Sequence, residues 1–96
     1  MPKGEDNLPT DYALAQNYPN PFNPSTTIEY SLPEQSNVTI TIYDALGNEL
    51  EVVYSGEMAA GVHRVTWDAP NYASGIYFYK MNTGKFVKVK KMLLLK

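Results

Sequence analysis

The strongest constraint on the fold of this chain is a two-residue periodicity that returns in short segments along most of its 96 residues. Such alternation is typical of β-strands with one buried and one solvent-facing side. Turn-forming residues separate the segments at a spacing of roughly ten residues, and no segment has helical periodicity. The sequence therefore predicts an all-β antiparallel sandwich of about seven strands. The expected strands lie near residues 14–17, 27–32, 38–43, 50–54, 62–67, 76–81 and 85–96.

Within this pattern, one loop and the centre of the core can be predicted. The pairs Ser55-Gly56 and Ala60-Gly61 bracket a short stretch that we expect to be a loop, because glycine is favoured in turns and weakens strand interiors. We expect the centre of the core to contain Tyr30, Ile40, Trp67 and Phe78.

The last segment, Gly84–Lys96, combines alternation with an uninterrupted apolar run. If Val87 and Val89 face inward, strict alternation also sends Lys91 inward and Met92 outward, which is costly for an unpaired lysine. We therefore predict a bulge near Lys90 and Lys91, or a strand that leaves the sheet, with Met92–Leu95 only partly buried.

The chain is long enough for one core, and its beginning differs from the rest. Residues 1–12 are polar and aperiodic, which predicts a linker or a disordered N-terminus, and residues 13–96 are predicted to form the sandwich. Between the first two expected strands, Asn17–Ser25 carries prolines at positions 19, 21 and 24. Because proline fixes φ and lacks an N–H donor, this stretch should be a rigid irregular corner.

Composition argues against catalysis and cofactor binding. Without cysteine there is no disulfide and no cysteine-based zinc site, and no run of about 18 apolar residues could form a membrane-spanning helix. His63, the sole histidine, shares its parity with Val65 and Trp67, which favours a packed strand residue over a catalytic base. No calcium loop or glycine-rich phosphate loop is present. We predict no catalytic residue, no cofactor and no metal.

The charge distribution leaves two interpretations open. The net charge is −2, but all ten acidic residues precede residue 80, whereas residues 80–96 hold six lysines and no acid. This lysine-rich end could bind a partner, or its lysines could keep an edge strand solvated and unpaired. Phe86 among these lysines would allow base stacking, but a pI near 5.2 argues against a nucleic-acid partner. Tyr77 and Tyr79 share a parity and form either a carbohydrate-binding face or ordinary core packing.

Five stretches, in order and spacing, resemble the successive motifs of the type A C-terminal sorting domain of the type IX secretion system. The resemblance extends from about residue 14 to the last residue, and a related immunoglobulin-like domain occurs in the flagellar hook-capping protein. Asn48 stands where the family often has arginine, and Met92 where it usually has an aliphatic residue. The five stretches are Asn17–Ile28, Ile42–Glu49, Ala60–Asp68, Ala73–Tyr79 and Lys90–Lys96.

The resemblance implies an immunoglobulin-like or fibronectin III-like sandwich that acts as a secretion signal and not as an enzyme. Its implied partners are the type IX outer-membrane translocon, a sortase-like peptidase and a cargo domain upstream, with passage through the periplasm to the cell surface or medium. The motif residues expected to build the fold are Pro19, Asn20, Pro21, Phe22, Asp44, Gly47, Gly61, Trp67, Gly75 and Tyr77. The residues expected to be recognised by the partner are Lys90, Lys91, Met92, Leu93, Leu94, Leu95 and Lys96.

Other hypotheses remain open at this point. The chain could be a passive accessory sandwich, a spacer or carbohydrate-binding module, of a secreted enzyme. An exposed final strand also makes an edge-paired homodimer plausible. The domain is not expected to insert into a membrane, and cleavage is expected in the linker before Leu14.

Overall fold

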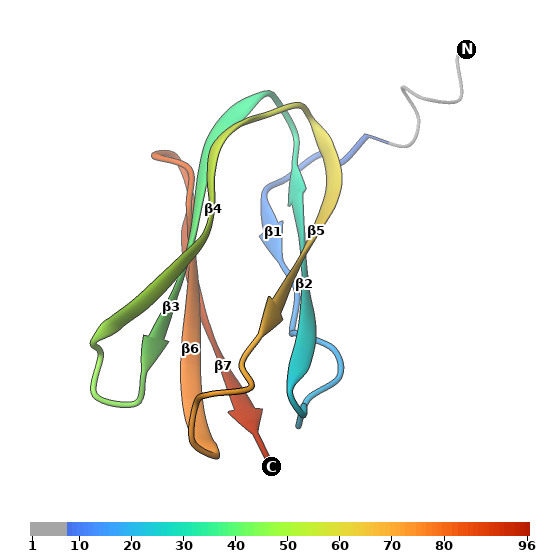
Figure 1. Ribbon diagram of the computed structural model, residues 1–96. Helices are drawn as coiled ribbons and strands as arrows, with labels where there is room; N and C mark the ends of the chain where they lie inside the picture. Colours follow the sequence, from blue (N-terminus) through green and yellow to red (C-terminus); the bar gives the residue numbers. More distant parts are fainter. Residues whose placement is uncertain (1–7) are drawn as a thin grey trace.

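The computed structural model describes residues 8–96, whose seven strands form two antiparallel sheets packed face to face (Figure 1). One sheet has the order β1-β2-β5, and the other has the order β4-β3-β6-β7. This confirms the predicted immunoglobulin-like or fibronectin III-like sandwich. The strands are β1 (Ala13–Leu14), β2 (Ser25–Leu32), β3 (Ser36–Asp44), β4 (Glu49–Met58), β5 (Gly61–Asp68), β6 (Gly75–Asn82) and β7 (Val87–Leu94).

The predicted linker, residues 1–12, is described by the structure only from residue 8 onward. Residues 1–7 lie outside the described residues, so the linker assignment of that part stays a prediction. Tyr12, which lies in the predicted linker, stacks on Phe86 with ring centroids 5.6 Å apart and donates a hydrogen bond to Glu34. The part of the chain that contacts the sandwich therefore includes Tyr12, one residue before β1.

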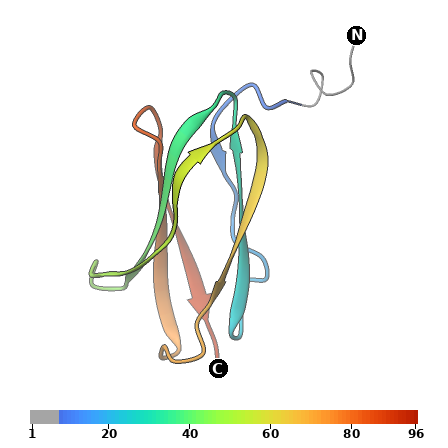
Figure 2. The same cartoon turned by 45° about the horizontal axis from the view of Figure 1, so that its top comes forward.

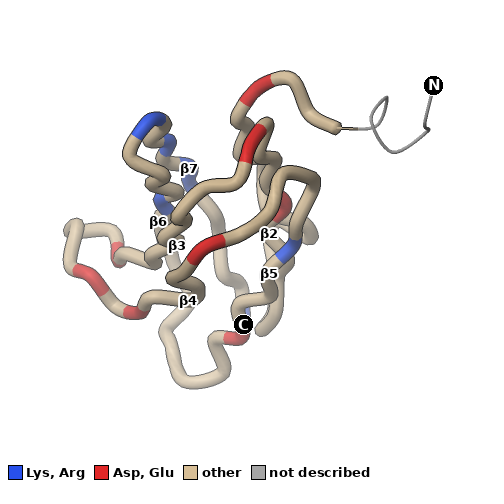
Figure 3. The backbone as a smooth tube through the Cα atoms, turned by 90° about the horizontal axis from the view of Figure 1, so that it is seen from above, with Lys and Arg blue, Asp and Glu red and all other residues tan. Residues whose placement is uncertain are grey.

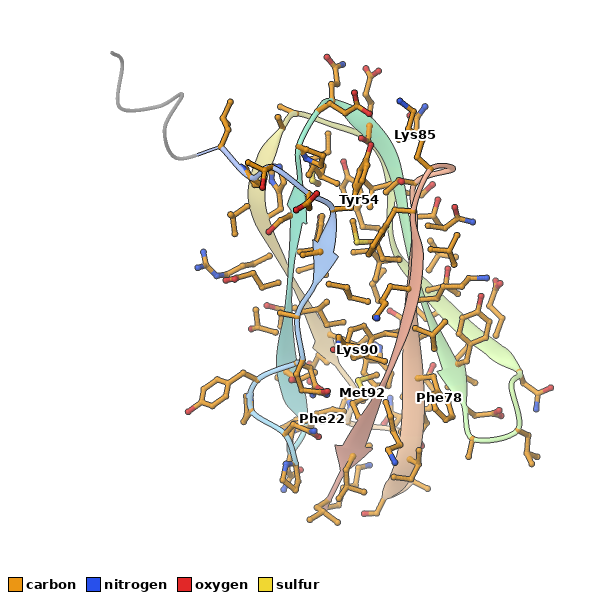
Figure 4. The ribbon with its side chains drawn as sticks, turned by 180° about the vertical axis from the view of Figure 1, so that it is seen from behind. Phe22, Tyr54, Phe78, Lys85, Lys90 and Met92 are labelled. Atoms are coloured by element: carbon orange, nitrogen blue, oxygen red, sulfur yellow. The ribbon has the colours of Figure 1, made fainter. Side chains whose placement is uncertain are left out.

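The core lies between the sheets and is centred on aromatic side chains. Trp67, Tyr30 and Ile40 are buried, as the sequence predicts. Phe78 is not part of this centre: it is half-buried on the outer face of the larger sheet, on the opposite side of β6 from the core (Figure 4). The prediction for Phe78 was wrong because β6 turns its other parity, Tyr77, Tyr79 and Met81, inward.

The inward tyrosines of β6 are accommodated because their hydroxyl groups have partners. The Tyr79 hydroxyl donates to the Ala15 carbonyl at 2.6 Å and accepts the Asn17 N–H at 2.8 Å. The Tyr77 hydroxyl donates to the Ala73 carbonyl, four residues upstream, at 2.6 Å. That bond at the start of β6 has the geometry of the tyrosine corner found in immunoglobulin-like domains. Burial of both rings leaves them unavailable for a carbohydrate-binding face.

Alkaline pH should destabilise the fold through Tyr30 and Tyr79. Burial raises the pKa of each hydroxyl to about 12. Because this lies above the unfolded value of about 10, the stabilisation is complete below pH 10 and is lost as the pH rises towards 12, by on the order of 1 to 2 kcal/mol per tyrosine after solvent screening. Denaturant unfolding followed by circular dichroism should show this decline, and Tyr79→Phe should make it shallower. A variant with the wild-type slope would contradict the assignment.

The predicted loop at residues 55–61 is wrong, because β4 continues to Met58 and pairs with β3 over this stretch. Gly56 lies inside the strand, opposite Val38. The φ of this glycine is +155°, a backbone conformation that favours glycine, and a Cβ there would lie 3.4 Å from the Tyr54 hydroxyl, an ordinary contact distance. Two register irregularities in the β3–β4 pair accompany this long strand, and their turn projects away from the sandwich (Figure 2).

The prediction for β7 was also wrong. The strand pairs with β6 in continuous register from Val87 to Leu94, with no bulge. Val87 and Val89 point outward, with 57% and 51% of their surface exposed, whereas Met92 and Leu94 are buried at 1% and 0%. Lys90 shares the inward parity and is half-buried (Figure 4). Its aliphatic stem can cover apolar surface while the ammonium group stays in water, so no lysine is buried unpaired.

Candidate recognition surface at the C-terminal strand

The proline corner, Asn17–Ser25, holds the far end of β7. The Phe22 N–H donates to the Leu93 carbonyl and the Leu95 N–H donates to the Phe22 carbonyl, both at 3.0 Å. The Asn20 side-chain oxygen accepts the Leu93 N–H at 2.9 Å. We call Asn20–Phe22 the corner clamp, because it acts as a short parallel neighbour along the outer edge of β7.

The corner keeps its shape through its own hydrogen bonds and one buried ring. Asn17, which is 2% exposed, donates from its side chain to the Pro19 carbonyl and the Thr26 hydroxyl. The Thr26 hydroxyl also donates to the Pro19 carbonyl at 2.8 Å. Phe22 is 2% exposed and packs on Trp67 with ring centroids 5.8 Å apart. The corner is therefore anchored to the core before it reaches β7.

The predicted recognition residues divide between core and surface. Met92 and Leu94 are core residues, and Leu93 is half-buried with its main chain held by the corner clamp. Lys91, Leu95 and Lys96 are exposed. The Lys96 N–H donates to the Ser74 hydroxyl at 2.9 Å, and its ammonium group donates to the Pro70 carbonyl. The end of the chain is thus bound to the sandwich while presenting charged side chains.

The lysines gather on the β6–β7 side of the molecule, away from the acidic β4 side (Figure 3). Lys85 pairs with Glu34 at 2.9 Å, and this contact, helped by the Tyr12 hydroxyl, lowers the pKa of the Glu34 carboxyl. Lys80 lies over the Tyr43 ring at 5.3 Å from its centroid. Within residues 8–96, Lys88, Lys90 and Lys91 form no ion pair. The strand therefore presents uncompensated positive charge.

The motif residues at the turns have structural roles. The Asp44 carboxylate accepts hydrogen bonds from the Asn48 side chain and from the Asn48 and Leu46 N–H groups, and the Asn48 amide contributes most to lowering its pKa. Gly47 in the same turn has φ +88°, which favours glycine. Gly61 and Gly75 also have positive φ, +140° and +154°, at the starts of β5 and β6.

His63, which the sequence offered as a possible catalytic base, is held by contacts with neighbouring residues. The His63 ring nitrogen Nε2 lies 2.8 Å from the Ala59 carbonyl oxygen, and the ring packs near Tyr30. Across residues 8–96, no three histidine or acidic side chains come together as metal ligands would. No helix in the described part of the chain could span a membrane.

Comparison with known families gives a match over most of the chain. Residues 16–95 match the Secretion system C-terminal sorting domain. The chain belongs to this family of type IX secretion sorting domains. Domains of the family are non-catalytic sorting signals, which supports a role in export to the cell surface or the medium. The matched range includes both the proline corner and the terminal strand that it clamps.

A solved structure has the same fold as this sorting domain. It is PorZ, an essential bacterial surface component of the type IX secretion system of Porphyromonas gingivalis, with 20% sequence identity and a TM-score of 0.54. The match covers 98% of this chain and 13% of PorZ. No curated protein sequence matched the chain.

Sequence reasoning missed the contact between the two ends of the domain. The corner and the final strand were each recognised as motifs, but Asn20 and Leu93 are 73 positions apart. No local pattern indicates that pairing. The sequence contains one indirect indication of this pairing. The proline corner and the final strand were both expected to have main-chain polar groups without partners, and such groups tend to pair.

Proposed function

We propose that this domain is a non-catalytic C-terminal secretion signal that directs a cargo domain fused upstream to the type IX outer-membrane translocon. The cargo reaches the periplasm first, crosses the outer membrane, and is then attached to the surface or released after cleavage by a sortase-like peptidase. Family membership over residues 16–95 carries this proposal. The packed His63 is consistent with a domain that performs no catalysis.

We propose that the translocon recognises the segment Lys90–Lys96 in its folded form. Met92, Leu93 and Leu94 would contribute by fixing the strand, and the exposed Lys91, Leu95 and Lys96, with the ammonium group of Lys90, would contact the partner. Positive charge on a fixed strand suits a receptor surface that carries carboxylates. A receptor of this kind would recognise both the shape of the folded strand and the positions of its lysine side chains.

A fusion experiment tests the signal hypothesis. Residues 1–96 are placed behind a fluorescent protein directed to the periplasm, in a bacterium with the type IX system and in a matched strain lacking its translocon. We expect fluorescence on the surface or in the medium only in the first strain. Cargo that stays inside both strains would favour the passive accessory module, and cargo that leaves both would also refute the signal.

Charge at the terminal segment can be tested without disturbing the fold. Replacing Lys90, Lys91 and Lys96 by glutamine should leave the thermal midpoint within a few degrees, since none of these ammonium groups is buried. Three exposed charge pairs at about 0.5 to 1 kcal/mol each would together lower receptor affinity at least about tenfold. Export should fall accordingly, with Lys80→Gln as the control. Unchanged export by the triple variant would remove electrostatics from recognition.

A further inference from the structure

The position beside the outer edge of β7 is filled along only part of the strand. The corner clamp occupies it next to Leu93 and Leu95, and the Gln16 side chain donates to the Lys91 carbonyl at 2.7 Å. Within residues 8–96, β7 is the end strand of its sheet and β6 is its one neighbour strand. Among residues 8–96, no strand lies beside Val87–Lys91 on this side.

The main-chain groups of Val87 and Val89 and the Lys91 N–H point towards that open position, whereas the Lys91 carbonyl already accepts from Gln16. In an antiparallel pair, the N–H and C=O of one residue face the partner strand and those of the next residue face away. Leu93 faces away from β6, because its N–H and C=O bind the corner clamp. Counting back by two, Lys91, Val89 and Val87 face away as well. The open edge can therefore form a ladder with an added strand.

The side chains of β7 specify what kind of strand would fit. Neighbouring residues across a sheet share a face, so a strand added here would place alternate side chains beside Val87 and Val89 and the others beside Lys88 and Lys90. The valines are about half exposed, and the lysines have no acidic partner within the described residues. The fitting strand alternates apolar side chains with carboxylates.

A second copy of the same edge fits poorly. Pairing two β7 edges antiparallel would bring Lys88 and Lys90 of one copy against lysines of the other, and like charges facing each other across a sheet are destabilising. Figure 3 shows that this side of the molecule is the basic one. Charge complementarity therefore favours an acidic partner over a homodimer through this edge.

We propose that the edge of β7 from Val87 to Lys91 is a strand-addition site for an extended segment of the recognising protein in which apolar and acidic residues alternate. This proposal rests on the proposed function and describes how the recognising protein would bind. Its extended segment would lie beside β7 as a fifth strand of the sheet, in line with the corner clamp. Main-chain hydrogen bonds supply affinity, and the alternating side chains supply selectivity.

Val89→Pro in the cargo fusion tests the main-chain part of the proposal. Proline removes the Val89 N–H, which faces away from β6, and edge strands tolerate proline at such positions. We expect the variant to keep its thermal midpoint within a few degrees while export falls about tenfold, the effect of one or two lost main-chain hydrogen bonds. Val89→Ala keeps the N–H and should export like the wild type. A folded Val89→Pro variant with wild-type export would overturn the proposal.

Amide hydrogen exchange on the unmodified chain tests the partner chemistry and does not depend on export or on any variant folding. The probe is the acetylated peptide Val-Glu-Val-Glu-Val, and the control is Val-Lys-Val-Lys-Val. We expect the acidic peptide at saturation to slow exchange at Val87 and Val89 about tenfold or more. No slowing, or equal slowing by the control, would overturn the proposal, as would slowing that depends on chain concentration alone. Failure of the wild-type fusion to be exported would refute the signal function instead.

Discussion

A chain without Met92–Lys96 should fail to fold. The deletion removes two fully buried side chains, Met92 and Leu94, and both hydrogen bonds that tie the main chain to Phe22. Truncation of each buried side chain alone costs about 2 to 5 kcal/mol. Their sum is comparable with the total stability of about 5 to 15 kcal/mol for a domain. Circular dichroism should show no cooperative thermal transition, and a transition within a few degrees of the wild type would contradict the packing described for β7.

A matched pair of point variants separates the two sides of the terminal strand. Leu94 is buried at 0% exposure and Leu95 is 50% exposed. Leu94→Ala should lower the free energy of unfolding by about 2 to 5 kcal/mol, and Leu95→Ala by less than about 1 kcal/mol. Loss of export on deleting the terminal segment would therefore report loss of the fold. Leu95→Ala and the lysine substitutions address recognition itself.

Trp67→Ala should have the second large effect, a loss of about 3 to 5 kcal/mol. The Trp67 ring is 1% exposed and contacts Phe22, Tyr72 and Tyr77 at centroid distances of 5.8, 5.4 and 5.7 Å. Its Nε1 donates to a Glu51 carboxylate oxygen at 3.1 Å. The substitution would loosen both the corner beneath β7 and the tyrosine corner of β6.

Equilibrium unfolding in urea, followed by circular dichroism, measures this effect. Tyr18→Ala is the matched control, because Tyr18 is an aromatic residue of the same corner with 80% of its surface exposed. It should change the free energy of unfolding by no more than about 0.5 kcal/mol. Equal losses for the two variants would mean that Trp67 does not anchor the corner.

The alternation in the sequence was sufficient to predict the sandwich but not which face of every strand is buried. In β6, either of two pairs of residues could have faced inward: Ile76 with Phe78, or Tyr77 with Tyr79. The tyrosines do so because Ala15, Asn17 and Ala73 offer main-chain partners for their hydroxyl groups. Those partners come from other segments, so the decision depends on tertiary structure.

The orientation of β7 shows how a single register is chosen for a whole strand. Judged locally, the valines at its start belong inside and the lysines outside. A shift by one residue turns every side chain to the other face, however, and Met92 and Leu94 lie on the parity of the lysines. Burying these two large residues against the core outweighs burying Val87 and Val89 near the end of the sheet, where the lysine stems can reach water.

The corner clamp has a consequence for the time at which the domain becomes complete. β7 is the last strand in chain order, yet its partner Phe22 is made among the first. During synthesis the main chain of Phe22 lacks these hydrogen-bond partners until Leu93 and Leu95 have left the ribosome. An unfinished translation product would lack the buried side chains of Met92 and Leu94 and the main-chain partners of Phe22. A domain built in this way completes its fold only after its last strand has been made.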